Sequence, residues 1–127
     1  MRLVMDPYQF DVLVMENMFG DIISDLTAGL VGGLGMAPAG NIGTDAAMFE
    51  AVHGSAPDIA GKGIANPTAL ALSAAMLLDH IEQPEVAERV RQALTAVIRK
   101  GEVLTGDLGG RATTREFADA VVRALPS

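Results

Sequence analysis

A long irregular segment, residues 53–67, constrains the fold of this chain more than any other feature. Its fifteen residues, HGSAPDIAGKGIANP, include three glycines and two prolines, which interrupt regular structure. Residues 47–52 before it are apolar enough for a strand, and the sequence from Pro67 onward is strongly helical. A connection of this length inside a compact domain is typically functional or disordered. Four apolar residues that could anchor it argue against disorder: Ala56, Ile59, Ile64 and Ala65. We therefore predict a binding loop.

The composition limits the class of protein. A length of 127 residues suits one domain with a real core. Half of the residues are hydrophobic but only five are aromatic (four Phe and one Tyr), so that core must be largely aliphatic. The net charge of −7 arises from 16 acidic and 9 basic residues, and the basic residues form no cluster. This pattern argues against a nucleic-acid partner, which needs clustered Lys and Arg.

The sequence shows no sign of secretion or of a membrane span. The absence of cysteine excludes disulfides and thiolate metal sites and fits a cytosolic protein. The most apolar stretch, residues 69–78, contains a serine and is far shorter than the ~20 residues that cross a bilayer. Asp6, Pro7 and Asp11 interrupt any signal-peptide pattern. We predict a soluble, cytoplasmic protein with no membrane partner.

The segments before the loop read as a mixture of strands and one helix. Residues 1–5 look like the end of an element that begins before the sequence does, and residues 10–15, FDVLVM, suit a buried strand of a parallel sheet. A helix with a wide apolar face is predicted from Gly20 to about Val31. Residues 38–43 read as turns, and residues 47–52 as the second strand.

Three helices are predicted after the loop. Asn66 is a plausible N-cap with Pro67 in the first turn, and this helix, apolar on nearly every side, should be buried to about His80. A second helix is predicted from Pro84 to a stop at Gly101. Thr113 and Glu116 form a capping box for a last helix through residue 125.

Two acidic residues suggest a metal site. Asp21 and Asp25 are four positions apart, so a helix projects both carboxylates from one face. The helix N-terminus favours acids in its first turn, which explains Asp21 well and Asp25 poorly. Alternatively, two carboxylates with substrate oxygens and water could complete the octahedral shell of Mg²⁺ or Mn²⁺. Spacing alone leaves both interpretations open.

The loop and its flanks carry further polar candidates. His53 is a lone histidine, more often structural than catalytic, and no nucleophile with an orienting acid is evident. Asp58 could accept hydrogen bonds from a ribose hydroxyl and repel a 2′-phosphate. Asn66 could cap the helix or meet an adenine edge. The glycines of GLVGGLG, residues 29–35, lack the spacing and the strand-to-helix context of a Rossmann fingerprint, so we read them as a helix exit.

Four motifs, taken in order, resemble the β-decarboxylating dehydrogenases, the family of isocitrate, homoisocitrate and isopropylmalate dehydrogenases. They are NMFGDIISD (residues 17–25), GNIG (40–43), FEAVHGSAPDIAG (49–61) and DLGG (107–110). The resemblance covers essentially the whole chain but only the C-terminal part of the family's longer enzymes. It implies an α/β fold that is not a Rossmann fold, with few strands and flanking helices. Residues 1–32 would end the small domain, and residues 33–127 would belong to the large, cofactor-binding domain.

The resemblance also assigns roles to residues. Asp21 and Asp25 would bind Mg²⁺ or Mn²⁺ together with the substrate. The cofactor would be NAD rather than NADP, because NADP-using relatives tend to have Lys-Tyr where this chain has Asp58-Ile59. The helix at residues 20–31 would pack across a homodimer interface. The cofactor-binding residues implied are Glu50 on the nicotinamide side, His53, Gly54, Ser55, Ala56, Pro57, Asp58, Ile59, Asn66, and Asp107 near the adenine.

The substrate implied is a small 2-hydroxy di- or tricarboxylate. The glycine run at 29–35 followed by PAGN at 38–41 is similar to isocitrate and homoisocitrate members, so isocitrate is favoured and isopropylmalate is the further alternative. The family's substrate arginines, its proton-transfer tyrosine and lysine, and a third metal aspartate have no counterpart in these 127 residues. We therefore expect no catalytic residue in this chain and no turnover by it alone. A non-catalytic association or regulatory module of such an enzyme is the alternative.

Overall fold

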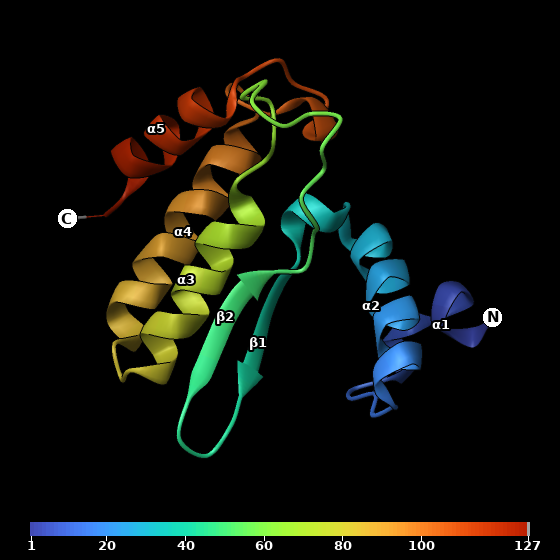
Figure 1. Cartoon of the computed structure of the whole chain (residues 1–127). Coiled ribbons are helices and arrows are strands. Elements are labelled where there is room, and N and C mark those ends of the chain that lie inside the picture. The colour runs from blue at the N-terminus through green and yellow to red at the C-terminus, as the bar shows by residue number, and fades with distance from the viewer. Residues whose placement is uncertain (127) are drawn as a thin grey trace.

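The computed structural model describes residues 1–126 and shows a short sheet with a layer of helices on one side of it and two helices set apart on the other (Figure 1). The elements before the loop are helix α1 (Arg2–Met5), 3-10 turn η1 (Pro7–Gln9), helix α2 (Asn17–Val31), 3-10 turn η2 (Leu34–Met36) and strands β1 (Pro38–Ile42) and β2 (Ala47–Ala51). The elements after it are helices α3 (Thr68–His80) and α4 (Pro84–Lys100), 3-10 turn η3 (Gly106–Leu108) and helix α5 (Thr114–Ala124).

The strands form an antiparallel hairpin that lies against α3. Pro38 pairs with Ala51 and Ile42 with Ala47, and the Gly43 amide closes the turn on the Ala46 carbonyl at 2.9 Å. The Ser73 hydroxyl donates to the Glu50 carbonyl at 2.6 Å, which fastens α3 to β2. A side chain at Gly40 would press against the ring of Phe49 at 3.2 Å. The sheet is therefore fixed to the helical layer by a short polar bond and by close packing.

The core lies between the helices rather than on the sheet. Leu94 and Val97 of α4 and Phe117 of α5 form its buried centre, and residues of α3 and of the segment before η3 pack around them. Each of these helices follows the apolar periodicity of the sequence. The helix predicted from Pro84 and its stop at Gly101 are confirmed, and Gly101 adopts a left-handed conformation with φ of 73°. The capping box of Thr113 and Glu116 is confirmed as well.

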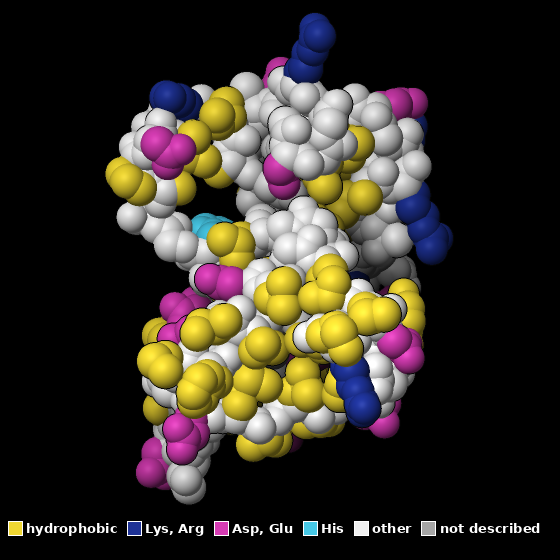
Figure 2. All heavy atoms as spheres, turned by 90° about the vertical axis from the view of Figure 1, so that its right-hand side faces the viewer, with side chains coloured by type: hydrophobic (Ala, Val, Ile, Leu, Met, Phe, Trp, Pro, Cys, Tyr) yellow, Lys and Arg dark blue, Asp and Glu magenta, His cyan; other side chains and the backbone are white. Residues whose placement is uncertain are grey.

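Helices α1 and α2 lie apart from this layered body (Figure 1). The packing of α2 onto the rest of the molecule runs through η2. Only Ala28 of α2 is buried among the residues described. The apolar face of α2 is consequently exposed, and Figure 2 shows hydrophobic side chains gathered over this side of the molecule.

The strand predicted at residues 10–15 is wrong. This segment is irregular, Val14 is 92% exposed, and the sheet of the described chain contains β1 and β2 alone, in antiparallel rather than parallel pairing. A strand exists only when its backbone groups find a neighbouring strand, and these residues have none here. Their β-branched composition indicated a propensity for strand, but no neighbouring strand pairs with them.

Other boundaries also differ from prediction. Residues 38–42 form a strand instead of turns, because a proline is tolerated as the first residue of a strand and a glycine where another side chain approaches closely. Helix α2 begins at Asn17, three residues before Gly20. Helix α3 begins one residue later than predicted and is only partly buried, since Leu70 and Leu77 are exposed.

Candidate functional site

The two candidate metal ligands lie on the exposed surface of α2. Because α2 begins at Asn17, Asp21 and Asp25 stand in its second and third turns, and no acid occupies the first turn. The stabilising field of a helix N-terminus fades beyond the first turn. The helix dipole therefore explains neither carboxylate, and two like charges at this spacing oppose each other. The metal role of this pair stays a prediction.

The N-terminal half of the predicted loop is exposed and bonded mainly to itself. The Val52 amide still donates to the Ala37 carbonyl at 3.2 Å, where the hairpin ends. Beyond that point, His53 Nδ1 lies 3.0 Å from the Gly54 carbonyl, and the Ile59 amide donates to the Ala56 carbonyl at 3.0 Å. Ala56 has a φ of 42°, in the left-handed region that residues other than glycine seldom occupy. Backbone strain of this kind is concentrated at functional sites.

The predicted apolar anchors of the loop are mostly wrong. Ile59 is half-buried, whereas Ala56, Ile64 and Ala65 are exposed. Hydrogen bonds hold the C-terminal half instead. The Thr114 amide donates to the Gly63 carbonyl at 2.8 Å, and its hydroxyl donates to the Ala65 carbonyl at 2.5 Å. The loop is thus ordered by polar contacts with the start of α5.

Asn66 joins three segments of the chain at the end of the loop. Its Oδ1 accepts from the Thr68 amide at 3.0 Å and from the Thr68 hydroxyl at 2.6 Å, so it bonds to the first residue of α3, although Pro67 and not Asn66 is the N-cap residue. Its Nδ2 donates to Asp107 Oδ2 at 2.8 Å and to Met36 Sδ at 3.6 Å. Two predicted cofactor residues, Asn66 and Asp107, therefore touch each other across 41 positions of sequence.

Glu50 lies on the exposed side of β2, opposite to the face that packs on α3. Its Oε1 accepts from Asn41 Nδ2 at 3.0 Å, a diagonal contact across the hairpin. The predicted residues thus fall into two sets, Asp21 with Asp25 on α2, and Glu50 with the loop and Asp107. No cluster of three or more acidic or histidine side chains suited to a metal ion occurs among residues 1–126.

Thr105 is a site neighbour that sequence reasoning missed. Its hydroxyl donates to Asp107 Oδ1 at 2.5 Å, and the residue has no exposed surface. Nearby serines, threonines and aspartates often bond within a turn, so the pair itself could have been suspected. No sequence signal connects it to Asn66, because that contact depends on the fold.

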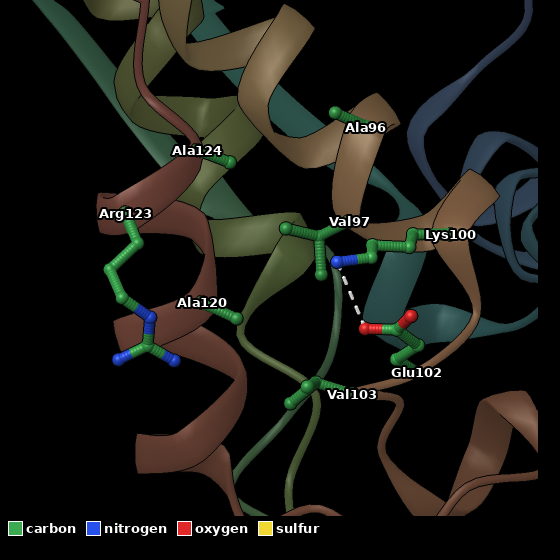
Figure 3. A pocket seen from close by; sticks show the side chains of 8 residues that line it. All are labelled: Ala96, Val97, Lys100, Glu102, Val103, Ala120, Arg123 and Ala124. Carbon is green, nitrogen blue, oxygen red and sulfur yellow. Dashed lines mark ion pairs between the residues drawn. The ribbon is translucent and has the colours of Figure 1, made fainter.

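One hollow of the surface lies away from these residues. It is lined by the end of α4, the following turn and α5 (Figure 3). Lys100 and Glu102 form an ion pair at 3.0 Å along its edge. Arg91 of α4 and Glu116 of α5 have shifted pKa values. Asp79 accepts from and attracts Arg91, which raises the pKa of Arg91, and hydrogen bonds from Thr113 lower the pKa of Glu116.

Comparison with known proteins identifies the family. The isocitrate/isopropylmalate dehydrogenase family matches residues 1–121. This chain belongs to that family. An isocitrate/homoisocitrate dehydrogenase of Thermus thermophilus is 63% identical over 127 residues, which are 100% of this chain and 38% of that protein. A 3-isopropylmalate dehydrogenase of Archaeoglobus fulgidus is 58% identical over 125 residues, 98% of this chain and 38% of that protein.

Solved structures agree with the fold. The crystal structure of isocitrate dehydrogenase from Methylococcus capsulatus superposes with a TM-score of 0.95 at 54% identity, covering 99% of this chain and 38% of that one. The predicted family and its non-Rossmann fold are thereby confirmed. The chain spans less than two fifths of the length of these relatives.

Within the described residues no helix is long and apolar enough to cross a membrane. Some relatives are named as mitochondrial, so the cytoplasmic location stays a prediction.

Proposed function

We propose that this chain is part of an oxidative decarboxylase that uses NAD and Mg²⁺ or Mn²⁺ and converts a 2-hydroxy acid, isocitrate in our favoured case, to 2-oxoglutarate and CO₂. The observation that carries the proposal is the family match over residues 1–121, which includes both the aspartate pair and the loop. Both features are exposed, as a site for small molecules requires.

The substrate rests on the sequence that follows α2. The glycine run before PAGN favours isocitrate or homoisocitrate over isopropylmalate. The Thermus relative is named for isocitrate and homoisocitrate, in agreement with that order, while the Archaeoglobus relative is named for isopropylmalate. Homoisocitrate and isopropylmalate are therefore the alternatives to test beside isocitrate.

Asp21 and Asp25 would supply two oxygen ligands to the metal. Carboxylate oxygens are suitable ligands for Mg²⁺ and Mn²⁺. Helix α2 places both carboxylates on one face, beyond the first turn in which the helix dipole acts. A bound divalent ion would act as a Lewis acid on the substrate oxygen. Two ligands leave most of an octahedral shell to substrate and water.

The loop from His53 to Asn66 would hold the adenosine half of NAD, the acceptor of hydride. The exposed Asp58 carboxylate would accept from the ribose hydroxyls and repel the 2′-phosphate of NADP. Asn66 uses all four hydrogen-bonding positions of its side chain within the protein, so its backbone is the part left for an adenine edge. Glu50 would face the nicotinamide side, and Asp107 would lie near the adenine.

We further propose that residues 1–32 end a small domain, that residues 33–127 belong to a large one, and that α2 packs across a homodimer interface. The separation of α2 from the layered body and its exposed apolar face support both ideas. The 127-residue chain should show no turnover by itself. Its described part contains no cluster of three acidic or histidine side chains suited to a metal ion.

Titrations on the purified chain test the cofactor and metal parts of the proposal. NAD should bind saturably in calorimetry and NADP more weakly. Mn²⁺ should bind in electron paramagnetic resonance titrations, and Asp25→Asn should abolish that binding. Asp119→Asn, which changes an exposed aspartate of α5, is the matched control. NADH formation from isocitrate by this chain would refute its inactivity, and equal Mn²⁺ binding by the Asp25 variant would refute the metal site.

A non-catalytic association module is the second candidate. The exposed apolar face of α2 favours it, because such a surface is expected to find a partner. This function predicts complex formation with a longer enzyme of the family and no NAD binding by the chain. Size-exclusion chromatography beside the NAD titration separates the two candidates.

A further inference from the structure

Thr105, Asp107 and Asn66 form a polar cluster at the C-terminal end of the loop. Asn66 is 7% exposed and Thr105 0%, so both are removed from water. Polar side chains are rarely buried without a bonding role, and no buried side-chain nitrogen or oxygen of the described residues lacks a partner. The cluster is therefore a completed network.

Each polar atom of the cluster has a fixed partner. Asp107 accepts from Asn66 through Oδ2 and from Thr105 through Oδ1, so one carboxylate is held from two sides. Bonds to a carboxylate are about twice as strong as bonds between neutral groups. Since both positions of Asn66 Oδ1 are taken by Thr68, rotation of the amide would break several bonds at once.

Thr105 is also fixed through its backbone. Its carbonyl accepts from the amides of Leu108 at 3.1 Å and Gly110 at 3.0 Å. A side chain at Gly110 would collide with the Leu104 carbonyl, so this turn requires a glycine. Gly35 of η2 approaches the cluster from the other side, where a side chain would lie 3.1 Å from Asn66 Cβ. Three segments thus converge on Asn66.

We propose that Thr105 is a positioning residue for NAD, acting through Asp107 to hold Asn66 and the C-terminal half of the loop in its binding conformation. This inference rests on the proposed function and deepens it. The N-terminal half of the loop, with Asp58, remains exposed. The cluster holds the end of the loop against which the adenosine half would rest.

The test replaces the hydroxyl of Thr105 without changing its shape. Thr105→Val should weaken binding of NAD and of ADP-ribose by the same factor, about tenfold for the loss of one bond to a charged group. Thr105→Ser should restore binding. Thr95→Val removes a hydroxyl from the exposed surface of α4 and should change nothing. If Thr105 had a purely structural role, Thr105→Val would lower the melting temperature, but it would not weaken the binding of NAD and ADP-ribose by the same factor. Thr105→Ser would then not restore binding.

Amide hydrogen exchange provides a readout that does not need the cofactor. Thr105→Val should speed exchange at Thr68 and Thr114, whose amides donate to Asn66 Oδ1 and to the Gly63 carbonyl, while amides of α4 stay protected. If the wild-type chain binds no NAD, the proposed function fails, and exchange alone decides the inference. Unchanged exchange and unchanged affinity in Thr105→Val would overturn it. If that variant does not fold, Asp107→Asn, which keeps the size of the carboxylate, takes its place in both measurements with the same expected outcomes.

Discussion

At the scale of single residues, Phe117 contributes most to the core. It has no exposed surface and packs with Leu94 and Val97 at the contact of α4 and α5. Phe117→Ala should destabilise the chain by about 3–5 kcal/mol, because it removes the ring and leaves a cavity. Urea denaturation followed by circular dichroism measures this loss. Phe19→Ala, at an exposed ring of α2, should cost under about 1 kcal/mol, and equal losses would contradict this location of the core.

Asp58 gives a second prediction, on cofactor choice. Asp58→Asn removes a negative charge from the exposed half of the loop, so repulsion of a 2′-phosphate should weaken. The ratio of NADP to NAD affinity should rise about tenfold, the size expected for one screened charge pair at the surface. Parallel calorimetric titrations measure the ratio. Asp45→Asn, in the exposed β1–β2 turn, is the control and should leave this ratio unchanged. An unchanged ratio in Asp58→Asn would show that the loop does not bind the ribose.

The roles of the predicted site residues stay predictions, and their contacts could be predicted only in part. Asp21, Asp25 and Asp58 are exposed as a binding role requires, and the bond of Asn66 to the first residue of α3 follows from its position before Pro67. The bond between Asn66 and Asp107 could not be predicted, because it joins residues 41 positions apart. The buried role of Thr105 depends on that bond and was missed for the same reason.

At the scale of elements, α5 depends on its capping box. The backbone amide and hydroxyl of Thr113 donate to the Glu116 carboxylate at 2.8 and 2.9 Å, which lowers the pKa of Glu116 below its ordinary value. A group whose pKa is lowered by folding stabilises the native state above its unfolded pKa, ~4.3 for glutamate. That stabilisation is lost as the pH falls through the lower pKa of the folded state.

Glu116→Gln should therefore lower the melting temperature at pH 7, and its difference from the wild type should shrink as the pH falls from 6 to 3. Thermal unfolding at a series of pH values measures the difference. Glu88→Gln, on the exposed surface of α4, serves as the control. A difference that stays constant over this range would show that the carboxylate charge does not stabilise α5.

Helices with start and stop signals in the local sequence were predicted correctly, whereas strands, which depend on a neighbouring strand, were not. Helices α4 and α5 have apolar periodicity together with a proline or a capping box at the start, and both lie where expected. Residues 10–15 and strand β1 were misread, because strand formation depends on which backbone lies alongside. Local sequence does not contain that information.

At the scale of the whole molecule, the exposed apolar face of α2 is the feature that the fold leaves unexplained. Ile22, Leu26 and Leu30 are spaced along one side of the helix and remain exposed. The layered body packs around α3 and α4 and offers α2 little more than its contact with η2. A surface of this kind is characteristic of a protein interface.

We therefore predict that the chain self-associates through α2. Sedimentation velocity over a range of concentrations should show a dimer. Leu26→Gln should shift the equilibrium toward monomer by roughly ten- to a hundredfold, since burial of a leucine contributes about 1.5–3 kcal/mol. Leu125→Gln is the matched control, because Leu26 is 41% and Leu125 40% exposed while Leu125 lies beyond α5 on the far side of the body. Equal effects of the two variants, or a wild-type chain that stays monomeric at every concentration, would contradict an interface on α2.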